Sequence, residues 1–345
     1  MRPFNRHCER SDAIQGRSAP SAGVRRIASS LVLLAMTILM GCATAHAETW
    51  PSRPIRMIVP IAPGGPTDTV ARLLGAHLGE MLGQQIVVDN RAGASGMIGM
   101  QVAKQAAPDG YTLVMGNAGA IGVSLALFKD AQYTADDFQT ISMVMTVPLI
   151  LVVRSELPAR SVPELIAYMK QHPNKLAIAS SGYGQTPYIA TELFRQQAGV
   201  EAVVVPFKGA APAAADLVAG NTQLMFDSTP TLPYIKDGTL RALAICNTQR
   251  SVLMPDVPTM AESGLDGFDV TSWYVVLAPT GTPQPIIARL HDAIATVMAR
   301  ADVKEKLATM NSEAVSSTPE AANAYVRAQI AHYRDVITRT GIKPE

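Results

Sequence analysis

The sequence predicts an α/β protein of two domains that face each other across a cleft. Three observations lead to this expectation. Short runs rich in β-branched residues alternate with amphipathic helical patterns, as in α/β domains built on largely parallel sheets. The 345 residues suffice for about two domains of ordinary size. A glycine-rich turn precedes a helical pattern in each half of the chain, and ligands favour such helix starts and domain interfaces.

The composition is that of an ordinary globular protein and excludes several functional classes. Hydrophobic residues make up 48% of the chain and charged residues 17%. These values exclude disorder, collagen and coiled coil. The 29 Lys and Arg residues nearly balance the 28 Asp and Glu residues, which argues against a nucleic-acid-binding protein with its basic surface.

Residues 1–47 have the pattern of a secretion signal peptide. A polar, arginine-containing stretch precedes an apolar run, residues 27–40, that is too short to span a bilayer. The small residues of Ala45-His46-Ala47 fit a cleavage site, so the mature chain is expected to begin at Glu48. Leu39-Met40-Gly41-Cys42 also resembles a lipobox, and a lipoprotein anchored at Cys42 is the alternative.

The residue types that carry catalysis or bind metals do not form a known pattern. Cys8 and Cys42 lie in the signal segment, so Cys246 would be the single cysteine of the mature chain. The sequence has no His-Glu-x-x-His pair and no Gly-x-Ser-x-Gly elbow. The glycines of segment 93–99 are interpreted as close packing of a turn on a helix. We therefore expect no metal, no cofactor and no enzymatic activity.

The expected strands are short apolar, β-branched runs bounded by turn residues. They are residues 55–60, 85–89, 112–115, 149–153, 176–179, 203–205, 224–226, 240–245 and 272–277. Helical patterns fall between most of them. In the first of these helices, the apolar residues at helical spacing are Val70, Leu73, Leu74, Leu78 and Met81, and Gly83 is expected to end it.

The C-terminal part of the chain is expected to form three helices. They cover residues 286–298, 303–310 and 319–340. For the last helix, Thr318 is expected as the N-cap residue and Pro319 at the first helical position.

The first candidate ligand-binding segment runs from residue 59 to residue 68 through a glycine-rich turn. Gly64 and Gly65 let the backbone approach a ligand, and Thr67 or Asp68 could cap the helix that follows. Unpaired N–H groups and the positive end of the dipole at a helix start bind anions, including carboxylates. A plain capped turn is the alternative interpretation.

Two further turns of this kind lie in the second half of the chain. The segment Ser180-Ser181-Gly182-Tyr183-Gly184-Gln185 repeats the first pattern with added hydroxyl groups, and Thr186 is expected as the N-cap residue before Pro187. The third turn contains Lys208-Gly209 and adds an ammonium group near a helix start. A solvated surface lysine is the alternative at Lys208.

Three single residues complete the set of candidates. Asn117 follows a strand and could supply an amide, or could lie in a surface turn. Asp227 could cap the next helix or recognise a ligand amine. Trp273, beside Tyr274, could line the cleft or fill a core.

Taken together, six segments resemble the Bug family, the extracytoplasmic solute receptors of tripartite tricarboxylate transporters. The segments are Trp50-Pro51-x-Arg53-Pro54-Ile55, Pro63-Gly64-Gly65-x-x-Asp68, Asn90-Arg91-x-Gly93-Ala94-x-Gly96, Pro108-Asp109-Gly110-Tyr111-Thr112-Leu113, Pro206-Phe207-Lys208-Gly209 and Ala278-Pro279-x-Gly281-Thr282-Pro283. Each is weak alone, but their order along the whole mature chain is specific.

This resemblance implies a type II periplasmic-binding-protein fold, in which two α/β domains close around a small ligand. The chain would cross between the domains near residues 148–153 and near residues 272–278. The expected organisation is a signal peptide (1–47), a discontinuous domain 1 (48–149 plus 275–345) and a continuous domain 2 (150–274).

The resemblance also implies a bound carboxylate, held by the glycine-rich turns and partly through water. Carried onto this sequence, it points to Gly64, Gly65, Thr67, Asp68, Ser180, Ser181, Gly182, Gln185, Lys208 and Gly209. The chain departs from the family at Ile61, where an aromatic residue is frequent, and at Tyr188, where a histidine is frequent. These differences bear on which acid would fit.

The expected function is that of a periplasmic receptor that captures a small organic carboxylate by domain closure. It would deliver this ligand to the permease of a tripartite tricarboxylate-type transporter. One alternative is a ligand-sensing receptor for a membrane sensor kinase. Another is a secreted hydrolase or isomerase that uses Asp68 or Asp227 as a general base.

Overall fold

The structure is a computed structural model, and it describes residues 50–227 and 229–343. The predicted signal peptide and the lipobox alternative at Cys42 lie outside the described residues. The chain divides into a unit of residues 1–49 and a unit of residues 50–345, and the description below concerns the second unit. Within the described part, no helix is both long and apolar enough to cross a membrane.

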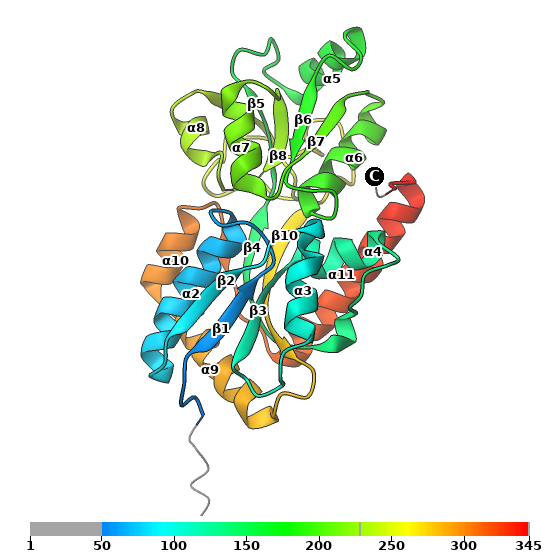
Figure 1. Ribbon diagram of the computed structural model, residues 1–345. Coiled ribbons are helices and arrows are strands. Elements are labelled where there is room, and N and C mark those ends of the chain that lie inside the picture. The colour runs from blue at the N-terminus through cyan, green and yellow to red at the C-terminus, as the bar shows by residue number, and fades with distance from the viewer. Residues whose placement is uncertain (1–49, 228, 344–345) are drawn as a thin grey trace, which may run out of the picture. The chain divides into compact units, whose positions relative to one another are not determined.

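The first sheet of the described residues has the strand order β11-β4-β10-β3-β1-β2 (Figure 1). Its parallel part consists of β1 (Ile55–Val59), β2 (Ile86–Asn90) and β3 (Thr112–Asn117). Strand β10 (Thr271–Pro279) pairs antiparallel with both β3 and β4 (Phe138–Pro148). The short β11 (Glu313–Ala314) pairs antiparallel with β4 at the edge.

The second sheet has the strand order β7-β6-β8-β5-β9. Strands β6 (Ala177–Ser180), β7 (Val203–Pro206) and β8 (Leu224–Asp227) form its parallel part. Strand β5 (Ile150–Arg154) pairs antiparallel with β8 and with β9 (Leu240–Ile245). In both sheets, an antiparallel strand therefore lies beside the three parallel strands. It is followed by β4 and β11 in the first sheet and by β9 in the second.

Helices cover both faces of the first sheet. One face packs against α2 (Pro66–Leu82) and α9 (Gln284–Ala299), with α10 (Ala301–Ala308) beside them. The other face packs against α3 (Met97–Lys104) and α11 (Pro319–Thr340). The remaining helical segments of this domain are η1 (Ala94–Gly96), the π-helix η2 (Ala118–Val123), α4 (Ser124–Leu127) and η3 (Ala135–Asp137).

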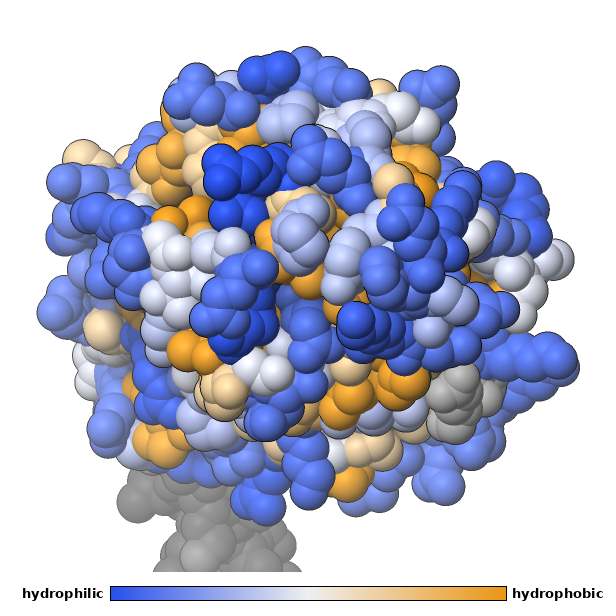
Figure 2. All heavy atoms as spheres, turned by 90° about the horizontal axis from the view of Figure 1, so that it is seen from above, coloured by the Kyte–Doolittle hydropathy of each residue, from blue (hydrophilic) through white to orange (hydrophobic). Residues whose placement is uncertain are grey.

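The second sheet is also covered on both faces. Helices α5 (Val162–Gln171) and α6 (Thr186–Ala198) pack on one face. Helices α7 (Ala210–Ala219) and α8 (Leu232–Lys236) pack on the other. Seen from above this domain, the surface is mostly polar, with apolar residues in small separate groups (Figure 2).

The chain passes between the two sheets twice. Strand β4 leads into β5 through Leu149, and the chain returns through β10, which begins at Thr271. Thr271 pairs with Pro148 and Tyr274 with Met145. Residues 271–274 therefore belong to the first sheet, although the sequence assigned them to domain 2.

The predicted type II fold is confirmed, with two differences in detail. The sheets are mixed rather than largely parallel, because each contains an antiparallel strand next to a domain crossing. Strand β4 was not predicted, because its eleven residues mix polar and apolar types without regular alternation and do not form a short apolar, β-branched run. The two-residue β11 was not predicted either. The predicted strands otherwise differ from the observed bounds by no more than a few residues.

The helix caps were predicted with mixed success. Thr318 caps α11 as expected, since its side chain accepts a hydrogen bond from the Ala321 N–H at 3.2 Å. Thr186 is not an N-cap residue: α6 begins at Thr186, and Gln185 is the N-cap. Gly83 ends α2 in the left-handed conformation, as predicted.

Candidate functional site

A cavity of about 40 Å³ lies where the carboxyl ends of β1, β3, β6 and β8 meet the crossing segments. We call it the central cavity. On the side of the first sheet it is lined by Ile61, Pro66, Thr67, Asn117, Ala118, Gly119, Ser272 and Tyr274. On the side of the second sheet and at the crossing it is lined by Leu149, Ser181, Gln185, Thr186, Pro187, Gly209, Ala210 and Asp227. The volume is a few times what one water molecule needs, which is about 10–15 Å³.

Four helical segments begin at the central cavity. Their first residues line it: Pro66 and Thr67 of α2, Ala118 and Gly119 of η2, Thr186 and Pro187 of α6, and Ala210 of α7. The first N–H groups of a helix have no acceptor within the helix, and the helix dipole is positive at this end. The cavity is therefore surrounded by sites that favour an anion.

The start of α2 is fixed by Asp68, whose side chain does not line the cavity. Asp68 Oδ2 accepts hydrogen bonds from the Gly64 N–H at 3.1 Å and from Arg72 Nε at 3.0 Å. Asp68 Oδ1 accepts one from Asn90 Nδ2 at 3.0 Å. Burial by itself would raise the pKa of Asp68, but the hydrogen bonds from Arg72, Gly64 and Asn90 outweigh it and hold the pKa below its usual range. Asp68 thus holds the first glycine-rich turn in shape as a carboxylate.

Asn90, from the end of β2, supports the same turn. Its Nδ2 group lies 3.2 Å from the carbonyl oxygen of Ile61 as well as 3.0 Å from Asp68 Oδ1. Ile61 lines the cavity, whereas Gly64 and Gly65 do not. Gly64 has φ of 87°, a left-handed value that suits glycine. No role for Asn90 was expected from the sequence beyond its place in the family resemblance.

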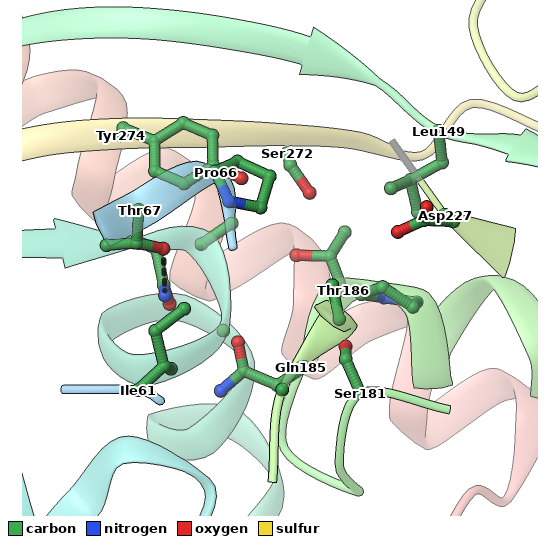
Figure 3. A pocket seen from close by; sticks show the side chains of 16 residues that line it. Ile61, Pro66, Thr67, Leu149, Ser181, Gln185, Thr186, Asp227, Ser272 and Tyr274 are labelled. Atoms are coloured by element: carbon green, nitrogen blue, oxygen red, sulfur yellow. Dashed lines mark hydrogen bonds between the residues drawn. The ribbon is translucent and has the colours of Figure 1, made fainter. Parts of the chain in front are cut away.

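Thr67 and Asn117 form a polar pair inside the cavity wall. Asn117 Nδ2 donates to Thr67 Oγ1 at 3.1 Å (Figure 3). Asn117 Oδ1 accepts from the Ala120 N–H at 2.7 Å. Both side chains are almost completely buried. Because Thr67 Oγ1 accepts from Asn117, its own hydrogen is left to donate to another group.

Ser181 and Gln185 line the cavity on the opposite side, together with Thr186. In Figure 3, the oxygens of all three side chains point toward the middle of the site. The turn between them is closed by a hydrogen bond from the Gln185 N–H to the Gly182 carbonyl at 3.1 Å. Gly182 and Ser180 lie behind this wall and do not line the cavity.

The third turn contributes backbone groups, and no charged side chain, to the cavity lining. Gly209 has φ of 137° and is the N-cap residue of α7, and it lines the cavity with Ala210. The Lys208 side chain is exposed and is not part of the lining. Its position is that of the solvated surface lysine considered as the alternative.

Asp227, Tyr274 and Ser272 line the part of the cavity near the domain crossing. Asp227 Oδ2 accepts a hydrogen bond from the Thr231 N–H at 3.0 Å. The N-cap residue of α8 is Thr231, so the predicted capping by Asp227 is wrong. Burial raises the pKa of Tyr274, and the nearby charge of Asp227 raises it further. Tyr274 is therefore a neutral phenol at physiological pH and can donate a hydrogen bond.

Trp273 does not line the cavity. Its ring is fully buried and packs edge-on against Tyr325, with ring centroids 5.8 Å apart. Ser272 and Tyr274 point into the cavity instead, because neighbouring residues of a strand face opposite sides. The alternation of side chains along a strand is the sequence pattern that could have shown that Tyr274 and Trp273 face opposite sides of the sheet. Tyr188 also lies outside the lining, and its hydroxyl donates to the Lys343 carbonyl at 3.1 Å.

The cavity lining is poor in charge. Among the described residues that line it, none is Lys or Arg, and Asp227 is the one with a carboxyl group. The described residues also contain no group of three or more His, Cys, Asp or Glu side chains that could hold a metal ion. Recognition of an anion here would depend on backbone N–H groups, hydroxyls and amides.

Two α/β domains that are joined by two crossing segments and enclose a small polar cavity between their sheets have the arrangement of periplasmic solute-binding proteins. The comparison with family models identifies the family. Residues 70–342 match the model of the tripartite tricarboxylate transporter family receptor, TctC. The chain belongs to this family, and the Bug resemblance seen in the sequence is confirmed.

Similar proteins agree with this assignment. Protein BugT of Bordetella pertussis is 39% identical over 304 residues, which cover 87% of this chain and 93% of BugT. The structure of the periplasmic binding protein BugD is similar with a TM-score of 0.82 at 33% identity, covering 86% of this chain and 100% of BugD.

Two of the similar solved structures contain an organic acid. Rpa4515 of R. palustris with adipate has a TM-score of 0.83 at 35% identity, and the match covers 86% of this chain and 100% of Rpa4515. MatC (Rpa3494) of Rhodopseudomonas palustris with bound malate has a TM-score of 0.80 at 34% identity, and the match covers 84% of this chain and 100% of MatC.

Proposed function

We propose that this protein is a periplasmic receptor that captures a small organic carboxylate in the central cavity and delivers it to a tripartite tricarboxylate-type permease. In this proposal, residues 1–47 are a cleaved signal peptide, and the two domains close around the ligand without chemical change. The observation that carries the proposal is the meeting of four helix starts at one cavity that has no cationic side chain in its lining.

The physical argument concerns how an anion can be buried without a counter-ion. A carboxylate loses its hydration when it enters a closed site, and this costs several kcal/mol unless hydrogen-bond donors replace the water. Backbone N–H groups at the starts of α2, α6 and α7 provide such donors from both domains. Thr67, Ser181 and Thr186 add hydroxyl groups. Because the donors come from both domains, a ligand that uses all of them would favour the closed form.

The sites of binding follow from the same geometry. We assign direct contacts to Thr67, Asn117, Ser181, Gln185 and Gly209, whose atoms line the cavity. Gly64, Gly65, Asp68, Ser180 and Gly182 shape the turns behind it. Asp227 and Tyr274 would meet the part of the ligand that is not the carboxylate. The adipate bound to Rpa4515 and the malate bound to MatC support a small organic acid as the ligand.

The experiment is a thermal-shift panel on the purified mature protein. The panel contains mono-, di- and tricarboxylates, aromatic acids and amino acids, each added after removal of co-purified ligand by partial unfolding and refolding. A ligand that binds the native state alone raises the melting temperature. A shift from at least one acid supports the proposal, and absence of a shift across the panel with a folded protein contradicts it. Co-purification with the permease subunits tests delivery separately.

A further inference from the structure

The loop between β2 and α3 carries two unusual backbone conformations and reaches the second domain. Ala94 and Ser95 have φ of 44° and 56°, in the left-handed region that non-glycine residues rarely adopt. Such strain persists only where the surroundings hold it, and it is frequent at ligand clamps and switches. The sequence had suggested only close packing for this segment.

Ser95 contacts the second domain through its carbonyl group and through its hydroxyl. Gln185 Nε2 donates to the Ser95 carbonyl at 2.8 Å, and the Gly184 N–H donates to Ser95 Oγ at 3.1 Å. The hydroxyl of Ser124, in the first domain, lies 3.3 Å from both the Ser95 carbonyl and the Gly184 carbonyl. We call Ser95, Ser124, Gly184 and Gln185 the Ser95 latch.

Two glycines allow this approach of the domains. A Cβ atom at Gly184 would lie 2.6 Å from both Ser124 Oγ and Ser95 Cβ, and one at Gly119 would lie 2.1 Å from Gln185 Oε1. Neither glycine has a positive φ. Gly184 is therefore required by the space between the domains and not by its own backbone conformation, whereas a Cβ at Gly119 would displace the amide end of Gln185.

The latch borders the ligand site directly. Gln185 is at once a partner of Ser95, the N-cap residue of α6 and part of the cavity lining. Its amide group is held by the Ser95 carbonyl, so the orientation of Gln185 in the cavity depends on a contact between the domains.

We propose that Ser95 is a positioning residue that couples domain closure to the central cavity: it stabilises the closed form and orients Gln185 toward the ligand. This inference rests on the proposed function, because it concerns closure around the same cavity. All atoms of the latch belong to the protein, so the latch contributes to closure in the absence of ligand as well. Since ligand affinity scales with the population of the binding-competent form, a weaker latch lowers affinity.

The test measures closure in the ligand-free protein. Spin labels are attached at Gln105→Cys and Gln171→Cys, two exposed positions at the ends of α3 and α5 in different domains. The native Cys246 is fully buried, and burial raises the pKa of its thiol, so it does not react with the label. Pulsed electron paramagnetic resonance then gives the distance distribution between the two labels.

The expected result is a short-distance population in the wild type that falls in the latch variants. Ser95→Gly removes the hydroxyl but keeps the carbonyl and suits the left-handed backbone, and it should lower the ratio of closed to open form about fivefold. Gly184→Ala should lower this ratio further, because its Cβ needs the space of Ser124 and Ser95. Gly79→Ala in α2 is the matched control, because its Cβ would lie 3.4 Å from the nearest atom. This variant should leave the ratio of closed to open form unchanged.

The latch is contradicted if the ligand-free wild type has no short-distance population, or if both latch variants keep it unchanged. Cooperative thermal unfolding identifies a variant that fails to fold, and Ser95→Gly then carries the test. In a second step, the acids of the thermal-shift panel are added. If none of them raises the melting temperature or the short-distance population, the proposed ligand class fails, whereas the latch is judged by the ligand-free result alone.

Discussion

Replacing Thr67 by valine tests the polar wall of the cavity with little change in side-chain shape. Thr67→Val removes the oxygen that accepts from Asn117 Nδ2 at 3.1 Å, inside a wall where Thr67 is 1% and Asn117 5% exposed. The amide donor of Asn117 is then buried without this acceptor. The free energy of unfolding should fall by about 1–3 kcal/mol, the cost of leaving a buried group unsatisfied.

The effect on ligand binding is calculated from the free hydrogen of the Thr67 hydroxyl. A hydrogen bond to a charged group contributes about 1.5–3 kcal/mol. At 1.4 kcal/mol for each tenfold change, Thr67→Val should weaken carboxylate binding about 10- to 150-fold. Titration calorimetry gives the affinity, and thermal denaturation gives the stability.

Thr67→Ser is the control, because it keeps the oxygen and loses only the methyl group. We expect a stability loss of about 0.5–1.5 kcal/mol, the usual cost of one buried methyl, and an affinity close to that of the wild type. The reasoning is refuted if Thr67→Val loses stability but keeps its affinity, or if serine and valine weaken binding equally.

Three further predictions follow from the same structure. Asn117→Asp keeps the acceptor for the Ala120 N–H but puts a negative charge in the lining, so calorimetry should show carboxylate affinity reduced by at least about 100-fold at pH 7, with partial recovery at lower pH. Asp68→Asn should lower the free energy of unfolding by about 1–2 kcal/mol, because it loses the charged contacts with Arg72 and Gly64. Because folding lowers the pKa of Asp68, its contribution to the free energy of unfolding is complete above the unfolded pKa of about 3.9 and is lost as the pH falls through the pKa of the folded state. Equal melting temperatures of wild type and Asp68→Asn at pH 7 would contradict this prediction. Lys208→Ala should leave affinity within about twofold at physiological salt, because the exposed ammonium is outside the lining, and a tenfold loss would show that Lys208 reaches the ligand.

Much of the fold could be predicted from local patterns. Helix α11 was predicted with its observed bounds, because Thr318, Pro319 and the apolar period all agree. Strand direction was not predictable in this way, since a short β-branched run looks the same whether the strand is parallel or antiparallel. The antiparallel β5 and β10 result from the return of the chain between the sheets, which is a long-range property.

The candidate site was predicted in its general location and less well in its individual residues. The glycine-rich turns marked the correct places because they precede helix starts. The sequence did not show which residues of each turn face the cavity: Thr67 does, and Asp68, one position further, turns back to Gly64 and Arg72. Nor did it indicate the contacts of Ser95 with Gly184, which depend on how close the two domains approach.

The central claim is that the helix starts around the cavity recognise a negative charge. The most direct measurement is titration calorimetry with the acid that gives the largest thermal shift and with its neutral amide of the same shape, such as adipate against adipamide. The account predicts binding of the acid and a loss of at least about 100-fold for the amide, because the N–H groups would lose their charged acceptor. Equal affinity for the two compounds would contradict it.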